Sequence, residues 1–246
     1  MKIAKKKSAP YIFLYHSVGS SESKSQSNKN LHDVPVDTFE QQLVQLKALY
    51  DFIPLDELCK RYQHRKRIKG LASVCFDDGY QNLIKNAIPI LHKHQVPATI
   101  FITGKLIKEK IFWRDRVRQL IELNEVDSFL DFSKHDLCNL ASLPVTSFYK
   151  ASKDPKITDP VLLDQLLEAY FSTKNKFFAQ EYQYILPSEI KDYPGVVWGN
   201  HTYNHYPLAA LNITKQRDEV EKGKAFLDTF QVSQSQYLSV PFGNPA

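Results

Sequence analysis

The chain has 246 residues, of which 43% are apolar and 24% charged, as in a globular protein large enough to bury its own core. The formal net charge of +5 is small and spread along the chain, so we expect no nucleic-acid partner. The three cysteines Cys59, Cys75 and Cys138 are odd in number and lack ligand spacing, which argues against a disulfide framework or a cysteine metal site.

The N-terminal segment does not have the form of a signal peptide. It is positively charged, but the apolar stretch Tyr11–Tyr15 is short and no small-residue cleavage site follows it. No window of the sequence approaches the length of a membrane span, so we expect no transmembrane segment. The lack of a signal favours a cytoplasmic location, and an extracytoplasmic or membrane-peripheral location is the alternative.

Short apolar runs, rich in β-branched and aromatic residues, predict the strands of the fold. They alternate with stretches of helical periodicity, which predicts parallel strands joined by crossover helices and therefore an α/β fold. The expected strands are Tyr11–Val18, Leu71–Phe76, Val96–Thr103, Gly195–Gly199 and Gln236–Val240. Tyr11–Val18 is expected to be buried.

Helices are expected between these strands. Their predicted positions are 39–49, a short helix after residue 56, 82–93 and 213–230. Asp37 or Thr38, Asp56 and Thr214 are the expected side-chain caps of three of them, because short polar side chains accept hydrogen bonds from the first free N–H groups of a helix.

Two segments interrupt the alternation. Gly19–Asn30 is rich in Ser, Lys and Asn and follows the first strand, so we expect a mobile loop at the rim of a site. Residues 107–194 carry no strand signal and predict a helical insertion within a single domain spanning residues 1–246. The helices expected there are Trp113–Leu123, Pro160–Ser172 and Lys174–Tyr184.

Two carboxylates, Asp77 and Asp78, follow the strand Leu71–Phe76 directly. An apolar strand that ends in two charges is costly unless those charges are paired or bound to a metal. An Asp-Gly pair such as Asp78-Gly79 is also common in turns, and one Asp can cap the next helix. Taken alone, the motif favours a turn.

Two histidines, His201 and His205, follow the strand Gly195–Gly199. Side chains four residues apart lie on one face of a helical turn, so both imidazoles are expected to reach one cation. Together with one carboxylate they form a facial set that leaves positions open for water and substrate.

The motifs FDDGY (76–80) and HTYNH (201–205) resemble the first two motifs of the polysaccharide deacetylases, the NodB-type carbohydrate esterase family 4. YHSV, the helix FEQQLVQLKAL, PLDEL, VPATIFI and the final VPFG are similar to that family as well, and FWRDRVR resembles part of an insertion in some bacterial members. The resemblance covers most of the chain outside residues 107–194. It implies a distorted (β/α)7 barrel with its site at the carboxyl ends of the strands.

The resemblance also implies roles for individual residues. Asp78, His201 and His205 would bind a divalent metal, most often Zn²⁺, with Co²⁺ or Ni²⁺ as alternatives. Asp77 would be the general base that takes a proton from water. The backbone N–H of Phe242 would stabilise the oxyanion of the tetrahedral intermediate.

The sequence departs from the family pattern in its last motif. Many members have RxPYG there, with an Arg that pairs with the base, whereas this chain has SVPFG at 239–243, so Asp77 is expected to lack that orienting partner. The usual acid histidine would lie beyond Ala246. In the rearranged branch that includes poly-N-acetylglucosamine deacetylases it lies at the N-terminal strand, where His16 fits. The alternative is that His16 is a rim residue and the acid lies outside this chain.

The expected function is hydrolysis of N-acetyl groups from an N-acetylated sugar polymer or glycolipid. Alternatives are a catalytically weak glycan-binding module that keeps the metal, or a deacylase of a non-sugar amide or ester. Tyr80, Tyr203 and Pro241 lie beside the motifs and are candidate substrate-binding residues, although core packing explains such aromatics equally well. Thr202 and Asn204 are expected to orient the two histidines.

Overall fold

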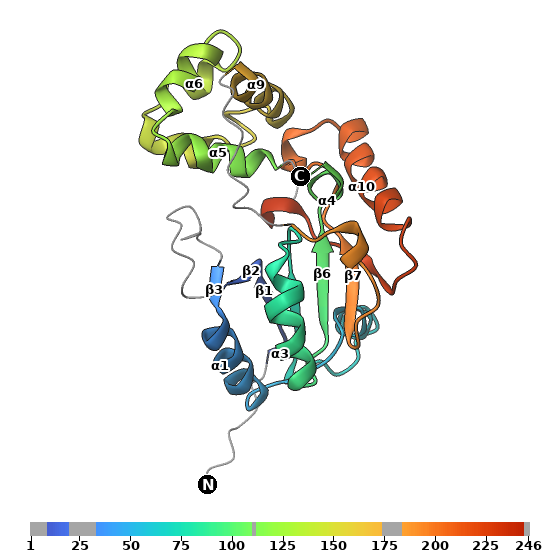
Figure 1. Cartoon of the computed structure of the whole chain (residues 1–246). Coiled ribbons are helices and arrows are strands. Elements are labelled where there is room, and N and C mark those ends of the chain that lie inside the picture. The colour runs from blue at the N-terminus through green and yellow to red at the C-terminus, as the bar shows by residue number, and fades with distance from the viewer. Residues whose placement is uncertain (1–8, 20–32, 110–111, 174–183, 244–246) are drawn as a thin grey trace.

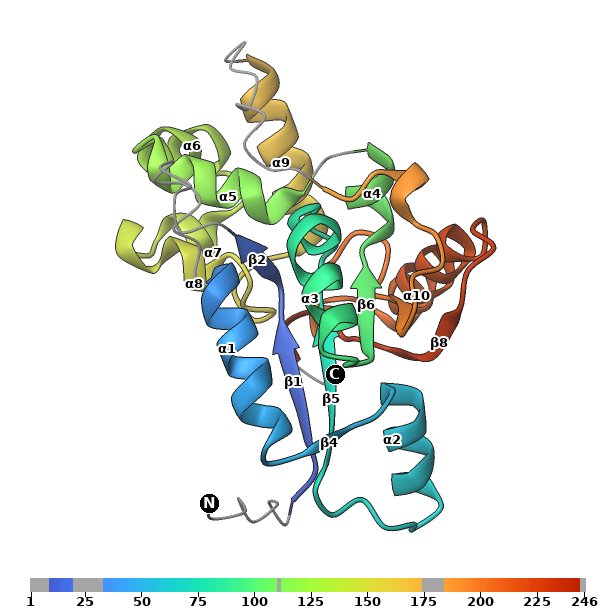
Figure 2. The ribbon, with the colours of Figure 1, turned by 60° about the horizontal axis from the view of Figure 1, so that its bottom comes forward.

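The computed structural model describes residues 9–19, 33–109, 112–173 and 184–243, and its centre is a parallel six-stranded sheet. The order along the sheet is β1-β5-β6-β7-β8, and β4 pairs with the beginning of β5 (Figures 1 and 2). The strands are β1 (Tyr11–Tyr15), β4 (Asp51–Phe52), β5 (Leu71–Phe76), β6 (Ala98–Ile102), β7 (Val196–Asn200) and β8 (Gln234–Leu238). The predicted α/β class is confirmed, and closure into a seven-stranded barrel stays a prediction.

The middle of the sheet is apolar on both faces. Every residue of β6 is buried, as is β5 from Ala72 onward, which is typical of parallel strands covered on both sides. Helices α1 (Val36–Lys47) and α3 (Ile88–Lys93) lie along one face (Figure 2). On this face Phe39 packs edge-on against Phe76, with ring centroids 5.8 Å apart.

The first strand differs from its prediction in two ways. Tyr11, Ile12 and Leu14 are about half exposed, at 50%, 53% and 52%, because β1 stands at one end of the sheet order and, among the described strands, pairs with β5 alone. The run also ends early: β1 stops before His16, and β2 (Ser17–Gly19) pairs separately with β3 (Asp33–Pro35). The expectation of one continuous buried strand over residues 11–18 was therefore wrong.

The helices outside the insertion lie close to their predicted positions, but their beginnings differ. Both α1 and α2 (Leu55–Gln63) start directly after a proline and have no side-chain cap, so the expected caps Asp37 or Thr38 and Asp56 were wrong. In both helices the proline is itself the N-cap residue, so no polar side chain stands there to accept from the first helical N–H groups. The segment expected to be one helix at 82–93 is a π-helical turn, Leu83–Ala87, followed by α3.

The last helix, α10 (Ile213–Leu227), has the side-chain cap that the first two lack. The cap is Asn212, whose side chain accepts from Lys215 N, and not Thr214 as expected. Strand β8 also begins two residues earlier than predicted.

Between β6 and β7 the chain is helical, as predicted. Figure 1 shows α5, α6 and α9 gathered beyond the carboxyl ends of the strands. The helices are α4 (Gly104–Glu109), α5 (Trp113–Glu122), α6 (Val126–Ser133), α7 (Cys138–Ala141), α8 (Phe148–Ala151) and α9 (Pro160–Thr173). The expected loop at 19–30 and helix at 174–184 fall almost entirely outside the described residues. The single-domain assignment stays a prediction.

A buried carboxylate, Asp164 of α9, ties the insertion to the rest of the fold. Its Oδ2 lies 3.0 Å from Lys105 Nζ of α4 and accepts from the Tyr206 hydroxyl at 2.7 Å, while Oδ1 lies 3.3 Å from Arg116 Nη1 of α5. One acidic side chain thus joins three segments. Within the part of the chain that the structure describes, no helix combines the length and apolarity that a membrane crossing requires.

Candidate active site

The two carboxylates lie in the turn that follows β5. Asp77 N donates to Tyr15 O at 3.0 Å, which extends the β1–β5 ladder by one residue. The backbone then turns sharply, because Asp78 has φ +74° and Gly79 has φ +102°. A non-glycine residue in this left-handed region is strained, and such strain is concentrated at functional sites. Thr103 N donates to Asp78 O at 3.2 Å and holds the turn against the end of β6.

The two histidines lie in the loop that follows β7, and this loop is not a helical turn as expected. Thr202 and His205 both have left-handed φ values, +66° and +61°. Thr202 Oγ1 accepts from His205 N at 3.1 Å and so shapes the loop between the histidines, in line with its expected role. Asn204 instead bonds Glu219 of α10, so the expectation that it orients a histidine was wrong.

Helix α10 supports the histidine loop from behind. Asn200 Oδ1 accepts from Thr202 N at 2.8 Å, and Asn200 Nδ2 donates to Val220 O at 2.9 Å. The helix reaches the loop this closely at Gly223, where an added Cβ would lie 2.3 Å from Asn200 Oδ1 and 2.8 Å from the Thr202 carbonyl carbon. A side chain at this position would displace the loop.

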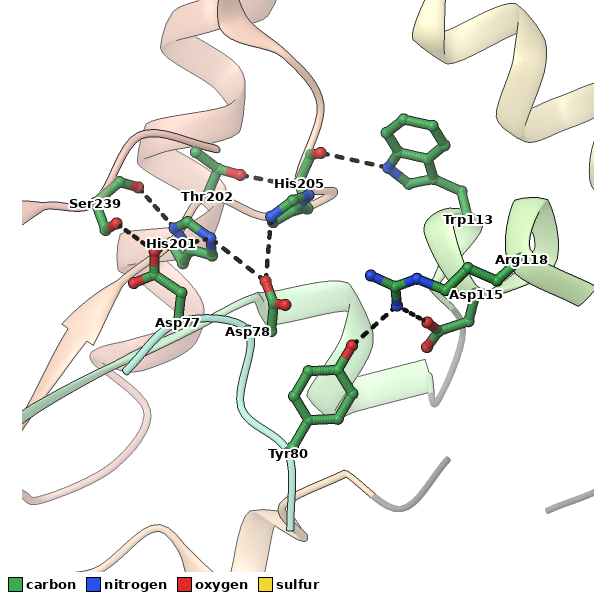
Figure 3. Close-up of polar contacts among 10 residues, drawn as sticks. All are labelled: Asp77, Asp78, Tyr80, Trp113, Asp115, Arg118, His201, Thr202, His205 and Ser239. Carbon is green, nitrogen blue, oxygen red and sulfur yellow. Dashed lines mark hydrogen bonds and ion pairs between the residues drawn. The ribbon is translucent and has the colours of Figure 1, made fainter. Parts of the chain in front are cut away.

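Asp78, His201 and His205 form a compact buried set (Figure 3). Asp78 Oδ1 lies 3.1 Å from His205 Nε2 and 3.5 Å from His201 Nε2, and the three residues expose only 4%, 1% and 6% of their surface. Apart from these two imidazoles, buried Asp78 Oδ1 has no hydrogen-bond partner among the described residues. Two imidazole nitrogens and one carboxylate oxygen with open positions suit a divalent transition metal, so these residues fit the expected ligand set.

The two histidines of the set have pKa values shifted in opposite directions. Burial favours neutral His201, but Asp77 and Asp78 outweigh it and raise the pKa of His201 to about 9. Burial dominates at His205 and lowers its pKa to about 4. Burial acts to raise the pKa of Asp78, yet the two imidazoles hold it well below the ordinary value. A metal ion binding here would therefore displace the proton of His201.

Ser239, just beyond β8, touches both halves of the site. Its carbonyl accepts from His201 Nδ1 at 2.8 Å, which leaves Nε2 free for a metal. Its hydroxyl donates to Asp77 Oδ2 at 3.0 Å. The family's Arg is absent as expected, but Ser239 stands in that motif position and contacts the Asp77 carboxylate itself, so Asp77 has a different orienting partner. Burial raises the pKa of Asp77.

The residues expected to carry the chemistry surround one cavity of about 910 Å³. His16 is half-buried at the end of β1, and Phe242 has a left-handed backbone with φ +62° and a ring centroid 4.9 Å from that of His205. The expected residues in the cavity lining are His16, Asp77, Asp78, His201, His205 and Phe242. The structure thus brings the six together, and their individual roles stay predictions.

The three expected substrate-binding residues lie elsewhere. Tyr80, Tyr203 and Pro241 are not among the residues that line the cavity. The Tyr80 hydroxyl accepts from Arg118 Nη1 at 3.2 Å, and the Tyr203 ring is packed so tightly on Gly104 that an added Cβ would lie 2.7 Å from it. These side chains contact packing partners, and a substrate-binding role for them finds no support in the cavity lining.

Sequence reasoning missed the wall that the insertion contributes. The Phe112 ring stands edge-on to His205 with centroids 5.0 Å apart. Trp113 Nε1 donates to His205 O at 3.3 Å (Figure 3). Arg114 and Tyr149 line the same cavity. The segment FWRDRVR was the available signal, but nothing local in it predicts contact with a histidine 92 residues away.

Comparisons with known proteins agree with this geometry. A family model described as polysaccharide deacetylase matches residues 64–129, which include Asp77 and Asp78. Poly-β-1,6-N-acetyl-D-glucosamine N-deacetylase of Staphylococcus aureus is 30% identical over 176 residues, covering 69% of this chain and 58% of that protein. The chain therefore spans less than two thirds of the length of these curated relatives.

Solved structures show the same fold at lower identity. IcaB from Ammonifex degensii aligns with a TM-score of 0.57 and 15% identity, covering 98% of this chain and 78% of that one. The Streptococcus pyogenes deacetylase PplD in complex with acetate aligns with a TM-score of 0.54 and 17% identity, covering 96% and 74%. The sequence matches and the shared fold lead to one assignment: the chain belongs to the polysaccharide deacetylase family.

Proposed function

We propose that this chain is a metal-dependent N-deacetylase that removes acetyl groups from an N-acetylated sugar polymer or glycolipid. The observation that carries the proposal is the buried Asp78, His201 and His205 set with a second carboxylate, Asp77, beside it in one cavity. A site that only binds a metal needs the ligand carboxylate but not the second one. The names of the Staphylococcus aureus relatives support a poly-N-acetylglucosamine substrate.

Asp78 and the two histidine Nε2 atoms would hold the cation, and we propose Zn²⁺ because the donors are two nitrogens and one oxygen. Co²⁺ and Ni²⁺ are expected to substitute. A bound cation supplies the acidity that makes a water nucleophilic near neutral pH and polarises the acetyl carbonyl. Ser239 O fixes His201 so that Nε2, and not Nδ1, is the ligand atom.

The other steps belong to the chain's own side chains. Asp77 accepts the proton of the attacking water, and its raised pKa brings it closer to the value suited to a base near neutral pH. The backbone N–H of Phe242, in its left-handed turn at the cavity, stabilises the oxyanion. His16, on the same cavity, donates the proton with which the amine leaves.

The test is release of acetate from β-1,6-linked N-acetylglucosamine oligomers by the zinc-loaded chain. Asp77→Asn keeps the shape of the side chain but removes the base, so kcat is expected to fall by about 10²- to 10⁴-fold while the zinc content stays unchanged. His92→Ala, on the exposed side of α3, is the matched control and should leave both unchanged. Full activity in Asp77→Asn would refute the assigned base.

The role of His16 is tested in the same assay. His16→Ala removes the proposed acid, so kcat is expected to fall by about 10²-fold, and an aryl acetate with a good leaving group should be affected much less. An equal loss on both substrates would contradict an acid role. Oligomer binding without acetate release by the unmodified chain would instead indicate a glycan-binding module, and activity on acetate esters alone would indicate a different deacylase.

A further inference from the structure

The helical insertion brings a group of cations to the cavity. They come from α5, from α8 and from the turn that follows α8, whereas the residues of the metal-binding set come from the loops at the strand ends. Apart from the two site carboxylates, Asp154 is the acidic residue in the lining, and it already accepts from the backbone N–H of Lys156 at 2.9 Å. The cations are Arg114, Arg118, Lys150, Lys153 and Lys156.

Arg114 is the cation in this group that is buried without a carboxylate in ion-pair contact. Only 2% of its surface is exposed, and its guanidinium donates to two neutral acceptors, Ser152 Oγ at 2.8 Å and Tyr149 O at 3.4 Å. Among the described residues no carboxylate forms an ion pair with it. Arg118, by contrast, is paired with Asp115. A buried charge without an opposite charge is costly, so an unpaired guanidinium at a cavity indicates an anionic ligand.

Arg114 and Lys153 share the same aromatic neighbours. Arg114 Cζ lies 4.5 Å from the Tyr149 ring centroid and 5.8 Å from that of Phe242, and Lys153 Nζ lies 5.0 and 5.9 Å from the same two rings. The Phe242 ring in turn contacts His205. The two cations are therefore separated from the metal-binding set by a single aromatic side chain, within reach of a substituent on the sugar that is being deacetylated or on its neighbour.

We propose that Arg114 and Lys153 form an anion subsite, with Lys150 and Lys156 exposed at its edge, that binds a phosphate or carboxylate group carried by the glycan substrate. The inference rests on the proposed function and, among N-acetylated sugar polymers, favours one that carries acidic groups over neutral poly-N-acetylglucosamine. A neutral oligomer offers these cations no partner. The amine produced by deacetylation is itself cationic, so the same cations would disfavour rebinding of product.

The experiment compares acetate release from three substrates of equal length: a neutral N-acetylglucosamine oligomer, one that carries a phosphate and one that carries a carboxylate. The zinc-loaded chain is expected to have a kcat/KM at least about tenfold higher for an acidic oligomer at low salt, with the preference shrinking as salt screens the charges. The phosphate and carboxylate oligomers then distinguish the two sources of the anion.

The variant is Lys153→Gln, which keeps the length of the side chain and removes its charge. The ratio of kcat/KM for acidic over neutral oligomer is expected to fall by about five- to tenfold, and the control Lys222→Gln, on an exposed face of α10, should keep the ratio of the unmodified chain. Arg114 is unsuitable for the first test because its buried guanidinium also supports the fold. Equal use of neutral and acidic oligomers, or an unchanged ratio in Lys153→Gln, would overturn the subsite.

Binding measurements separate this proposal from the proposed function. If the zinc-loaded chain releases no acetate from any of the three oligomers, the proposed deacetylase function fails, and calorimetric Kd values for the same oligomers still test the subsite. Tighter binding of an acidic oligomer that is weakened in Lys153→Gln would support it. Equal binding of neutral and acidic oligomers would refute it.

Discussion

The loops at the strand ends and the helical insertion build the same cavity in opposite ways. The loops after β1, β5, β7 and β8 bring together residues from positions 16 to 242, and they leave buried polar atoms without a hydrogen-bond partner, among them Asp77 Oδ1 and His205 Nδ1. In the insertion the buried carboxylates are ion-paired instead, Asp115 with Arg118 and Asp164 with Arg116 and with Lys105 of α4. Buried polar groups without partners indicate where a ligand binds. The loops are therefore suited to carry the reactive groups, and the insertion to form the wall of the cavity.

The backbone shows the same contrast. Asp78, Thr202, His205 and Phe242 all have left-handed φ values, although none is a glycine. In the insertion from α5 to α9, Asn124 is the described residue with such a conformation. Strain of this kind is stable only when the surrounding structure holds it, and the parallel sheet supplies that support at the strand ends. The insertion does have one buried charge without an ion-pair partner among the described residues, Arg114, and it lines the same cavity.

The largest effect is expected at the metal set. His205→Ala removes one of three ligands, so bound zinc should fall from about one ion per chain toward zero, and kcat/KM should drop by about 10³-fold or more because metal catalysis contributes several kcal/mol. Metal analysis and acetate release measure the two quantities together. His92→Ala again serves as the control. Retention of a full zinc equivalent by His205→Ala would place the metal elsewhere.

The next effect concerns the stability of the insertion. Asp164→Ala leaves the Lys105 and Arg116 cations and the Tyr206 hydroxyl without their shared acceptor, which should lower the free energy of unfolding by about 3 kcal/mol. Urea unfolding followed by circular dichroism measures it.

A matched control for this change is Asp218→Ala. Asp218 pairs with Lys222 on the surface of α10, where both side chains are more than half exposed, so its loss should cost less than about 1 kcal/mol. Similar destabilisation by the two variants would show that the buried charge pairs of Asp164 do not hold the insertion in place, and the contrast between the two regions would fail.

The sequence predicted the part of the site that depends on local pattern. Short apolar runs located β5 and β7, and the carboxyl ends of parallel strands meet at one edge, so Asp77, Asp78, His201 and His205 had to lie close together. The predicted helical turn for His201–His205 was wrong because the loop is held by long-range backbone bonds, Tyr203 N to Glu219 O of α10 and Gly104 N of α4 to Thr202 O, which the local sequence does not predict.

Long-range contacts account for what else was missed. SVPFG contains no feature that predicts a hydrogen bond from Ser239 to Asp77, because the two residues are 162 positions apart. The cavity wall from the insertion depends likewise on where α5 docks. The prediction of helix caps was wrong for a simpler reason. Pro35 and Pro54 occupy the N-cap positions of α1 and α2, where a polar side chain was expected nearby.

A smaller effect is expected in the pH dependence of zinc binding. It tests whether the charged groups at the strand ends are arranged to bind a metal ion. His201, with its pKa raised to about 9, is protonated at neutral pH in the metal-free protein, whereas His205, with a pKa of about 4, is already neutral and Asp78 is already ionised. Zinc must displace one proton below pH 9, so the apparent Kd should weaken by about tenfold for each pH unit lost between pH 8 and pH 6.

Competition titrations with a chelator of known proton affinity measure this slope, and calorimetry in two buffers measures the released proton. About one proton per zinc is expected at pH 7. A Kd that does not change from pH 8 to pH 6 would show that His201 is neutral before metal binds, and the electrostatic imbalance of the site would have to be reconsidered.

The smallest effect is expected at Ser239, whose hydroxyl donates a hydrogen bond to the Asp77 carboxylate from a neighbouring strand-end loop. Ser239→Ala removes the hydroxyl that donates to Asp77 but keeps the carbonyl that accepts from His201 Nδ1. The hydrogen bond contributes about 1 kcal/mol, so kcat should fall by about fivefold while KM and zinc content stay unchanged. Ser239→Thr should restore kcat, and Ser172→Ala, on the surface of α9, is the control. If zinc content fell with kcat, Ser239 would act through His201, and Asp77 would be the unoriented base that the missing Arg suggested.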